Sequence, residues 1–126
     1  MKSLLIVGFG GFLGAVSRYA INIFMIKIVS SSFPWSTLLV NVLGSFLMGA
    51  LVESFSQKIN FSHELKLLLV VGFLGSFTTF STFSLDAVSL FGRGEYLSSY
   101  LYISLSVLLS IGSLILAMYI MKSFIL

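Results

Sequence analysis

The sequence predicts an all-α membrane protein built from four transmembrane helices. Its mean hydropathy is +1.12. Only 9% of its 126 residues are charged, whereas about a quarter of the residues of a soluble domain are charged. Four apolar runs, each long enough to cross a bilayer, fill nearly the whole chain. We therefore expect a single four-helix transmembrane domain over residues 1–126.

The composition also limits the chemistry. The chain has no cysteine, which excludes disulfides and thiolate metal sites. One histidine and four carboxylates offer little material for acid–base or metal-dependent catalysis. The net charge of +3 comes from scattered residues rather than a basic patch, so nothing favours nucleic-acid binding. We expect a membrane protein that is not an enzyme.

We expect the helices at residues 3–29, 34–55, 64–91 and 96–122, with short connections. The first run is too long for the apolar core of a cleaved signal peptide and is expected in the mature protein. Pro34 suits the first position of the second helix, where its missing N–H costs nothing. Ser62 is the expected cap of the third helix, with Glu64 near its positive end.

The first helix carries glycines and one charge. Gly10 and Gly14 form a small-xxx-small pair that predicts a close contact with another helix. Arg18 lies well inside the run, where a charge is expensive and usually functional. A snorkelling arginine that anchors the helix at the interface is the alternative interpretation. Both interpretations of Arg18 stay open on the sequence.

The second helix places Thr37, Asn41 and Ser45 on one face, because they follow one another at i, i+4 spacing. Asn41 lies about a third of the way along the span. Its amide could bond a neighbouring helix or a passing anion, and the first of these is the commoner use of a buried amide.

Residues 72–83 of the third helix predict a break at mid-membrane depth. Two glycines, five hydroxyl residues and four phenylalanines gather within one dozen positions. Glycine and threonine weaken a helix, and Ser and Thr side chains compete for its backbone hydrogen bonds. Backbone freed in this way is tolerated in a membrane where it is buried in protein, binds an ion or lines a cavity. Close helix packing through small residues is the alternative interpretation.

Polar and aromatic side chains also recur at helical spacing. Phe80 and Phe83 share a face, and the positive ring edges of phenylalanine could favour an anion, although lipid contact is the default. Asp86 is expected to approach the interface and is given no role. In the fourth helix a row of hydroxyls, one every four residues, suits the transient solvation of an anion; the row consists of Tyr102, Ser106 and Ser110, and Leu114 ends it.

The pattern resembles the CrcB/Fluc family of small fluoride channels, over all four spans. The resemblance is carried by Gly14 with Arg18-Tyr19, by residues 37–45 (Thr-Leu-x-x-Asn-x-x-Gly-Ser) and most specifically by Gly72-Phe73-x-Gly75 running into residues 78–83 (Thr-Thr-Phe-Ser-Thr-Phe). Two positions depart from the family pattern. Ser76 stands where a second glycine is common, and Leu114 stands where the hydroxyl row often continues.

The resemblance implies a fluoride channel of the cell inner (plasma) membrane that exports fluoride passively. It implies a dual-topology, antiparallel homodimer with two pores and one structural Na⁺ at the dimer interface. The backbone carbonyls of Gly75 and Thr78 would hold this ion. The implied pore residues are Arg18, Asn41, Phe80, Thr82, Phe83, Tyr102, Ser106 and Ser110, with Arg18 by the vestibule.

Insertion in both orientations is compatible with the charges. Four Lys residues lie toward the side of the two termini: Lys2, Lys58, Lys66 and Lys122. Lys27 and Arg93 lie toward the other side, so the Lys/Arg excess that orients a membrane protein is small.

Two rivals to a fluoride channel remain. The mechanism of a small multidrug transporter needs a membrane-embedded carboxylate in the first helix, and this first helix has no Asp or Glu. The second rival is a non-transporting assembly subunit, which would be favoured if the purified protein conducted no ion.

Overall fold

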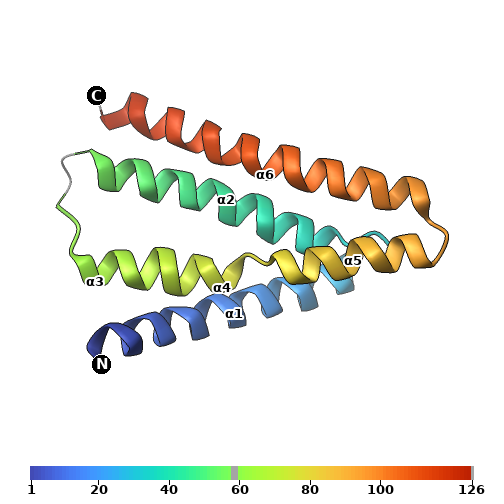
Figure 1. Cartoon of the computed structure of the whole chain (residues 1–126), viewed down its shortest axis with the longest axis horizontal. Helices are drawn as coiled ribbons and strands as arrows, with labels where there is room; N and C mark the ends of the chain where they lie inside the picture. Colours follow the sequence, from blue (N-terminus) through green and yellow to red (C-terminus); the bar gives the residue numbers. More distant parts are fainter. Residues whose placement is uncertain (58–59, 126) are drawn as a thin grey trace.

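The computed structural model describes residues 1–57 and 60–125 as four long helical units with short connections (Figure 1). The first two are α1 (Lys2–Ile28) and α2 (Trp35–Ser56), and the fourth is α6 (Tyr96–Ile125). The third unit, His63–Gly92, consists of the four segments α3 (His63–Lys66), η1 (Leu67–Leu74), α4 (Gly75–Phe77) and α5 (Phe80–Gly92). All four units are long and apolar enough to cross a membrane, as the sequence predicts.

The helix boundaries fall close to the expected ones. The prediction that Pro34 opens the second helix is wrong by one residue, because its ψ of 66° lies outside the helical range and Trp35 is the first helical residue. The expected cap of the third unit is confirmed, since the Ser62 side chain accepts a hydrogen bond from the Leu65 N–H. Glu64 lies in that first turn and also pairs with Lys2 at 3.2 Å.

The glycines of α1 make the predicted close contact. A methyl group added to Gly10 or Gly14 would collide with backbone atoms of η1, those of Leu68 and Phe73. The two helices therefore approach backbone to backbone over this length, which only small residues allow. This contact joins α1 to the first half of the third unit.

A second layer is formed by α2 and α6, which run side by side over most of their length (Figure 1). Gly49 lies directly against the backbone of Leu114, and the Ser113 hydroxyl donates to the carbonyl of Val42 at 3.0 Å. Leu114, which ends the hydroxyl row in the sequence, thus lies at a close helix–helix contact.

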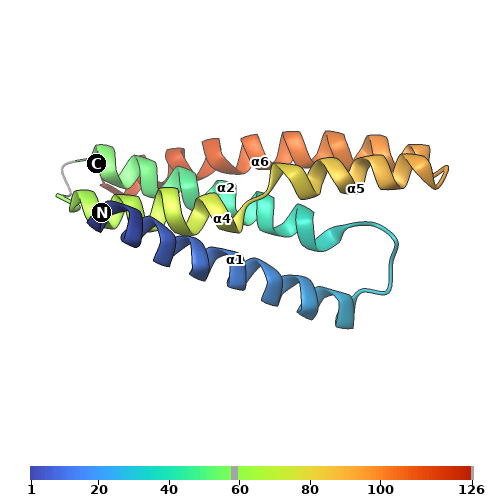
Figure 2. The ribbon, with the colours of Figure 1, turned by 60° about the horizontal axis from the view of Figure 1, so that its bottom comes forward.

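The third unit changes partners along its length. Its first half, η1 and α4, packs against α1, whereas α5 packs against α6. Figure 2 shows the result: α1 and α5 diverge toward the end of the molecule that carries the connection 29–34. We call this end the loop end. Residues of α1, α2 and α5 line a cavity at this end.

Both termini lie at the opposite end, beside the start of α3 (Figure 1). The loop end carries residues 29–34 and the turn 93–95. Lys58, which contributes to the predicted charge bias, lies outside the described residues. Apolar side chains cover much of the outer surface of all four units, among them Phe12 at 62% exposed, as expected of a surface that faces lipid.

Candidate functional site

A cavity of about 470 Å³ lies between α1, α2 and α5. One wall is the connection 29–34, and apolar side chains such as Met25 and Val40 form part of the lining. Polar and charged side chains also line it, among them Arg18, Asn22, Ser36, Thr37, Thr79, Thr82 and Asp86. Of the predicted pore residues, Arg18 and Thr82 are therefore in the cavity wall.

Two residues of extended backbone separate α4 from α5, and the second of them, Thr79, lines this cavity. Thr78 has φ −80° and ψ 156°, and Thr79 has φ −152° and ψ 119°, between α4 and α5. The N–H and the hydroxyl of Thr78 both donate to the Leu74 carbonyl. Thr79 caps α5, because its hydroxyl accepts from the Thr82 N–H at 3.1 Å. The hydroxyl residues of the motif thus satisfy backbone groups next to them.

Asn41 fixes the same stretch of backbone from α2. Its Nδ2 donates to the Thr79 carbonyl at 3.0 Å, and its Oδ1 accepts from the Thr79 N–H at 2.7 Å. One amide therefore satisfies both backbone groups of Thr79, a residue that is 8% exposed. The sequence left two partners open for this amide, a neighbouring helix or an anion. In the structure it bonds a neighbouring segment of the chain.

We call the two extended residues Thr78 and Thr79 the junction. The phenylalanine pair lies beside the junction, on α5. The rings of Phe80 and Phe83 are 5.5 Å apart between centroids, which agrees with their predicted common face. Phe83 packs on Tyr102 with a centroid distance of 5.3 Å. Phe80 points away from the chain and is 79% exposed. The single chain therefore does not enclose the pair.

Asp86 is a site residue that the sequence analysis missed. Its Oδ2 accepts a hydrogen bond from the Tyr102 hydroxyl at 3.1 Å, and the carboxylate lines the cavity. The signal that could have found it is its spacing, because Asp86 follows Thr82 at i+4 and shares its face. Asn22 was missed as well; its Oδ1 accepts from the Ser36 hydroxyl at 2.8 Å.

The hydroxyl row on α6 divides into three environments. Tyr102 is fully buried and bonded to Asp86. Ser106 is 5% exposed, and its hydroxyl finds no partner among the described residues. Ser110 is half-buried, and its carbonyl accepts from Ser113. An unpartnered buried hydroxyl is costly, so the Ser106 hydroxyl has a donor to offer.

Of the two residues expected to hold a cation, Gly75 precedes the junction and Thr78 is its first residue. Gly75 is exposed and Thr78 is half-buried in the single chain. The helical segment that contains Gly75 ends at Phe77. Its last carbonyls therefore have no amide partner further along the helix, and they carry the negative end of its dipole.

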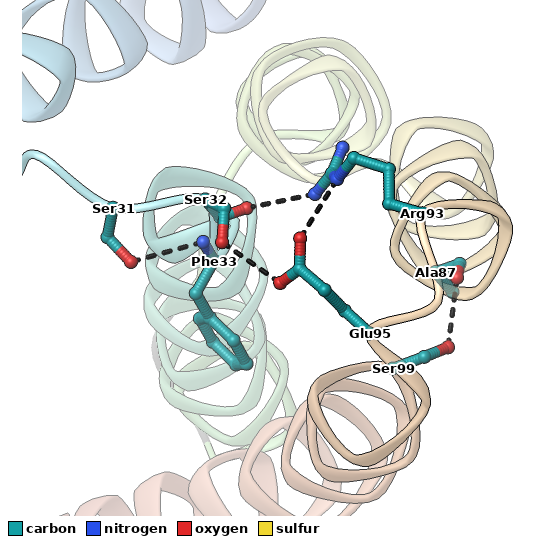
Figure 3. Close-up of polar contacts among 7 residues, drawn as sticks. All are labelled: Ser31, Ser32, Phe33, Ala87, Arg93, Glu95 and Ser99. Atoms are coloured by element: carbon teal, nitrogen blue, oxygen red, sulfur yellow. Dashed lines mark hydrogen bonds and ion pairs between the residues drawn. The ribbon is translucent and has the colours of Figure 1, made fainter.

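A polar cluster closes the loop end (Figure 3). Glu95 accepts from the Ser32 hydroxyl and from Arg93 Nε, each at 3.0 Å. Arg93 Nη2 donates to the Ser32 carbonyl at 3.3 Å. The hydrogen bonds from Arg93 and Ser32 lower the pKa of the Glu95 carboxyl below its ordinary value. Close by, the Ser99 hydroxyl of α6 donates to the Ala87 carbonyl of α5 at 2.9 Å.

These features define a small multi-pass α-helical membrane protein whose polar groups gather at a cavity and at irregular backbone, an arrangement typical of channels and transporters. The chain belongs to the CrcB family. The family model described as CrcB-like protein, Camphor Resistance (CrcB), matches residues 5–118. The resemblance stated from the motifs is thereby confirmed.

Curated relatives extend the match over almost the whole chain. The fluoride-specific ion channel FluC of Rhizobium johnstonii is 46% identical over 123 residues, which is 98% of each protein. The protein of the same name from Agrobacterium fabrum is 48% identical over 113 residues, 90% of each. That from Shewanella sp. strain ANA-3 is 52% identical over 106 residues, 84% of this chain and 85% of the relative.

Proposed function

We propose that this protein is a fluoride-selective channel through which fluoride leaves the cell passively. It is a multi-pass protein of the cell membrane and not an enzyme. The names of its relatives supply the ion. The observation in the structure that carries the proposal is the junction at which Asn41 holds the extended backbone of Thr79, a residue that lines the polar cavity.

The junction suits an anion because it creates the start of a helix inside a membrane span. The first amides of α5 have no carbonyl partner within the helix and form its positive end. The buried Ser106 hydroxyl has no partner among the described residues and offers a donor. In the proposed path fluoride enters past Arg18 and Thr82, passes Asn41, Phe80 and Phe83, and follows the hydroxyls of Tyr102, Ser106 and Ser110. Fluoride is small and strongly hydrated, so closely spaced donors must replace its water.

A second copy of the chain completes this path. Phe80 is 79% exposed and Gly75 is exposed, although both belong to the proposed site. We place them at the interface of a homodimer in which the two copies run antiparallel, each with its own pore. A two-fold axis in the membrane plane brings the two Thr78–Thr79 junctions together at mid-depth. The small Lys/Arg excess of the sequence is compatible with insertion both ways.

One Na⁺ is proposed at this axis, held by the carbonyls of Gly75 and Thr78 from both copies. Carbonyl oxygens at the negative end of a helix suit a small hard cation. The ion would also offset the cost of bringing an anion into a low-dielectric region. Such an ion stabilises only the assembled form. Dimers should therefore dissociate less readily in Na⁺ than in an equal concentration of N-methylglucamine, and equal dissociation in the two salts would argue against the site.

Fluoride release from liposomes that contain only this protein tests the function directly. With a fluoride-selective electrode outside the vesicles, we expect rapid release once the membrane potential is clamped by valinomycin and K⁺. Matched vesicles loaded with chloride and read with a chloride electrode should release little. Fluoride release no faster than from protein-free vesicles would overturn the proposal.

Single cysteines at Ser31 and Ser56 test the antiparallel assembly, because the chain has no cysteine of its own. The two positions lie at opposite ends of the molecule, and both are exposed. In intact cells a membrane-impermeant thiol reagent should label about half of the copies at each position, as equal insertion in both orientations requires. Labelling at only one of the two positions would mean a single orientation and rule out the antiparallel dimer.

A further inference from the structure

The polar cluster at the loop end links two connections that are distant in the sequence. Ser32 and Glu95 are 63 residues apart. Three hydrogen bonds among Ser32, Arg93 and Glu95 form a closed triangle, in which every member bonds the other two (Figure 3). We call these three residues the clasp. Two of the bonds reach the Glu95 carboxylate, and hydrogen bonds to a charged group are stronger than neutral ones.

The backbone of the turn 93–95 is built to present the clasp. Gly94 has a φ of +79°, a conformation that favours glycine. The Glu95 N–H bonds to the Leu90 carbonyl and the Gly94 N–H to the Phe91 carbonyl, which is the pattern of a Schellman motif at the end of α5. The end of α5 thereby fixes the backbone positions from which the Arg93 and Glu95 side chains extend.

The clasp holds a connection that reaches into the core. Ser32 is followed by Phe33, whose ring meets the Tyr102 ring edge-on at 5.6 Å. Tyr102 in turn packs on Phe83 and donates to Asp86. Ser32 and Phe33 also line the cavity. A displacement of residues 31–33 would therefore change the lining of the cavity and remove the Phe33 ring from its contact with Tyr102.

We propose that Ser32, Arg93 and Glu95 are positioning residues for conduction: they hold Phe33 against Tyr102 and so keep the cavity mouth and the neighbouring Phe83 in place. This role rests on the proposed channel function. None of the three has to touch fluoride. They act through Phe33 and Tyr102, and the Tyr102 ring lies 5.3 Å from that of Phe83.

Trp35 reports on the clasp without any added label. It is the single tryptophan of the chain. Its ring lies 4.6 Å from that of Phe33, and it lines the cavity at 44% exposed. A loosened connection exposes Trp35 to solvent. We therefore expect stronger acrylamide quenching of its fluorescence in Glu95→Ala and Arg93→Ala than in the unsubstituted dimer.

In the same variants we expect fluoride release from liposomes to slow by about fivefold, the size set by a few charge-assisted, partly exposed contacts. Because the clasp is one closed unit, the double variant should lose no more than either single variant. Ser32→Ala should show the same defect, and Ser32→Thr, which keeps the hydroxyl, should restore both readouts. A defect that follows the hydroxyl in this way is caused by the hydrogen bond from Ser32 to Glu95.

The exposed pair Lys2–Glu64 provides the matched control. It has a similar N–O distance of 3.2 Å but lies at the opposite end of the molecule. Glu64→Gln should leave both the quenching and the release rate unchanged. The same result for the clasp variants would overturn the proposal.

Acidification gives an independent reading of the clasp. The connection 29–34 carries no titratable side chain, and Arg93 is the charged group that bonds Glu95. The next residue, Tyr96, meets the Phe91 ring edge-on at 4.8 Å. The pKa of Glu95 is lowered in the folded state, so the clasp persists above the ordinary value of 4.5 and is lost as the pH falls through the lowered one. The quenching of Trp35 fluorescence should rise only when the pH falls below the lowered pKa of Glu95. Glu95→Gln should abolish this pH-dependent rise.

The two readouts separate the possible failures. Unchanged Trp35 quenching in all clasp variants would show that the clasp does not hold the connection. Altered quenching with a normal release rate would remove its role in conduction. Wild-type vesicles that release no fluoride would instead overturn the proposed function, whatever the fluorescence shows.

Discussion

Replacing Asn41 by alanine is expected to lower fluoride release by at least about tenfold. The side chain satisfies both the N–H and the carbonyl of Thr79, at 2.7 and 3.0 Å. Alanine leaves both groups unpaired in a buried position, at a cost of about 1–3 kcal/mol each. The backbone of Thr79 must then move to find other partners, which disrupts the proposed path beside it.

Two further variants sharpen this test. Asn41→Asp can still accept from the Thr79 N–H, but it has no donor for the carbonyl and adds a negative charge beside the anion path. We expect it to release fluoride more slowly than Asn41→Ala. Ser45→Ala, one turn along the same face of α2, serves as the control and should retain most of the activity. Normal release by both Asn41 variants would contradict the role given to the junction.

The four spans and their local ends could be predicted because they depend on residues close in the sequence. Apolar runs of sufficient length predict the helices, and the cap at Ser62 follows from the residue types next to it. The contact of Gly10 and Gly14 could also be predicted, since two small residues four apart always present a flat face. The sequence alone does not predict which helix packs on that face.

The arrangement of the site could not be predicted from periodicity alone, because its bonds join residues far apart in the chain. Asn41 and Thr79 are separated by 38 positions, and either of two uses was open to the amide. Asp86 was given no role because a carboxylate near the end of a span usually faces water. Its bond to Tyr102 depends on α5 leaving α1 and packing on α6. That change of partner is a property of the packed helices.

The clasp is a second example of the same limit. Arg93, Gly94 and Glu95 are ordinary residues for a short polar turn, and Ser32 stands in a run of three serines. Only the folded chain brings them to within 3.0–3.3 Å of one another. By contrast, Phe80 and Phe83 could be placed on one face from their spacing, and the structure confirms this.

Phe80→Ile and Phe83→Ile are each expected to slow fluoride release by about tenfold or more without dissociating the proposed dimer. Isoleucine keeps an apolar, bulky side chain but lacks the ring quadrupole, whose positive edge attracts an anion. In Phe83→Ile the packing on Tyr102 at 5.3 Å is also lost. Phe80→Ile loses the ring contact with Phe83 at 5.5 Å, but Phe80 is 79% exposed in the single chain and therefore contributes little to its packing.

Phe80 therefore separates the two interpretations of an exposed phenylalanine in a membrane helix. If it merely faces lipid, it should behave like Phe12 of α1, which is 62% exposed and belongs to no described site. Phe12→Ile is then the matched control, and its release rate should stay near that of the unsubstituted protein. If Phe80 lines a pore completed by a second copy, only Phe80→Ile should be slow. Equal and normal rates for Phe80→Ile and Phe12→Ile would return Phe80 to the lipid surface and remove it from the proposed path.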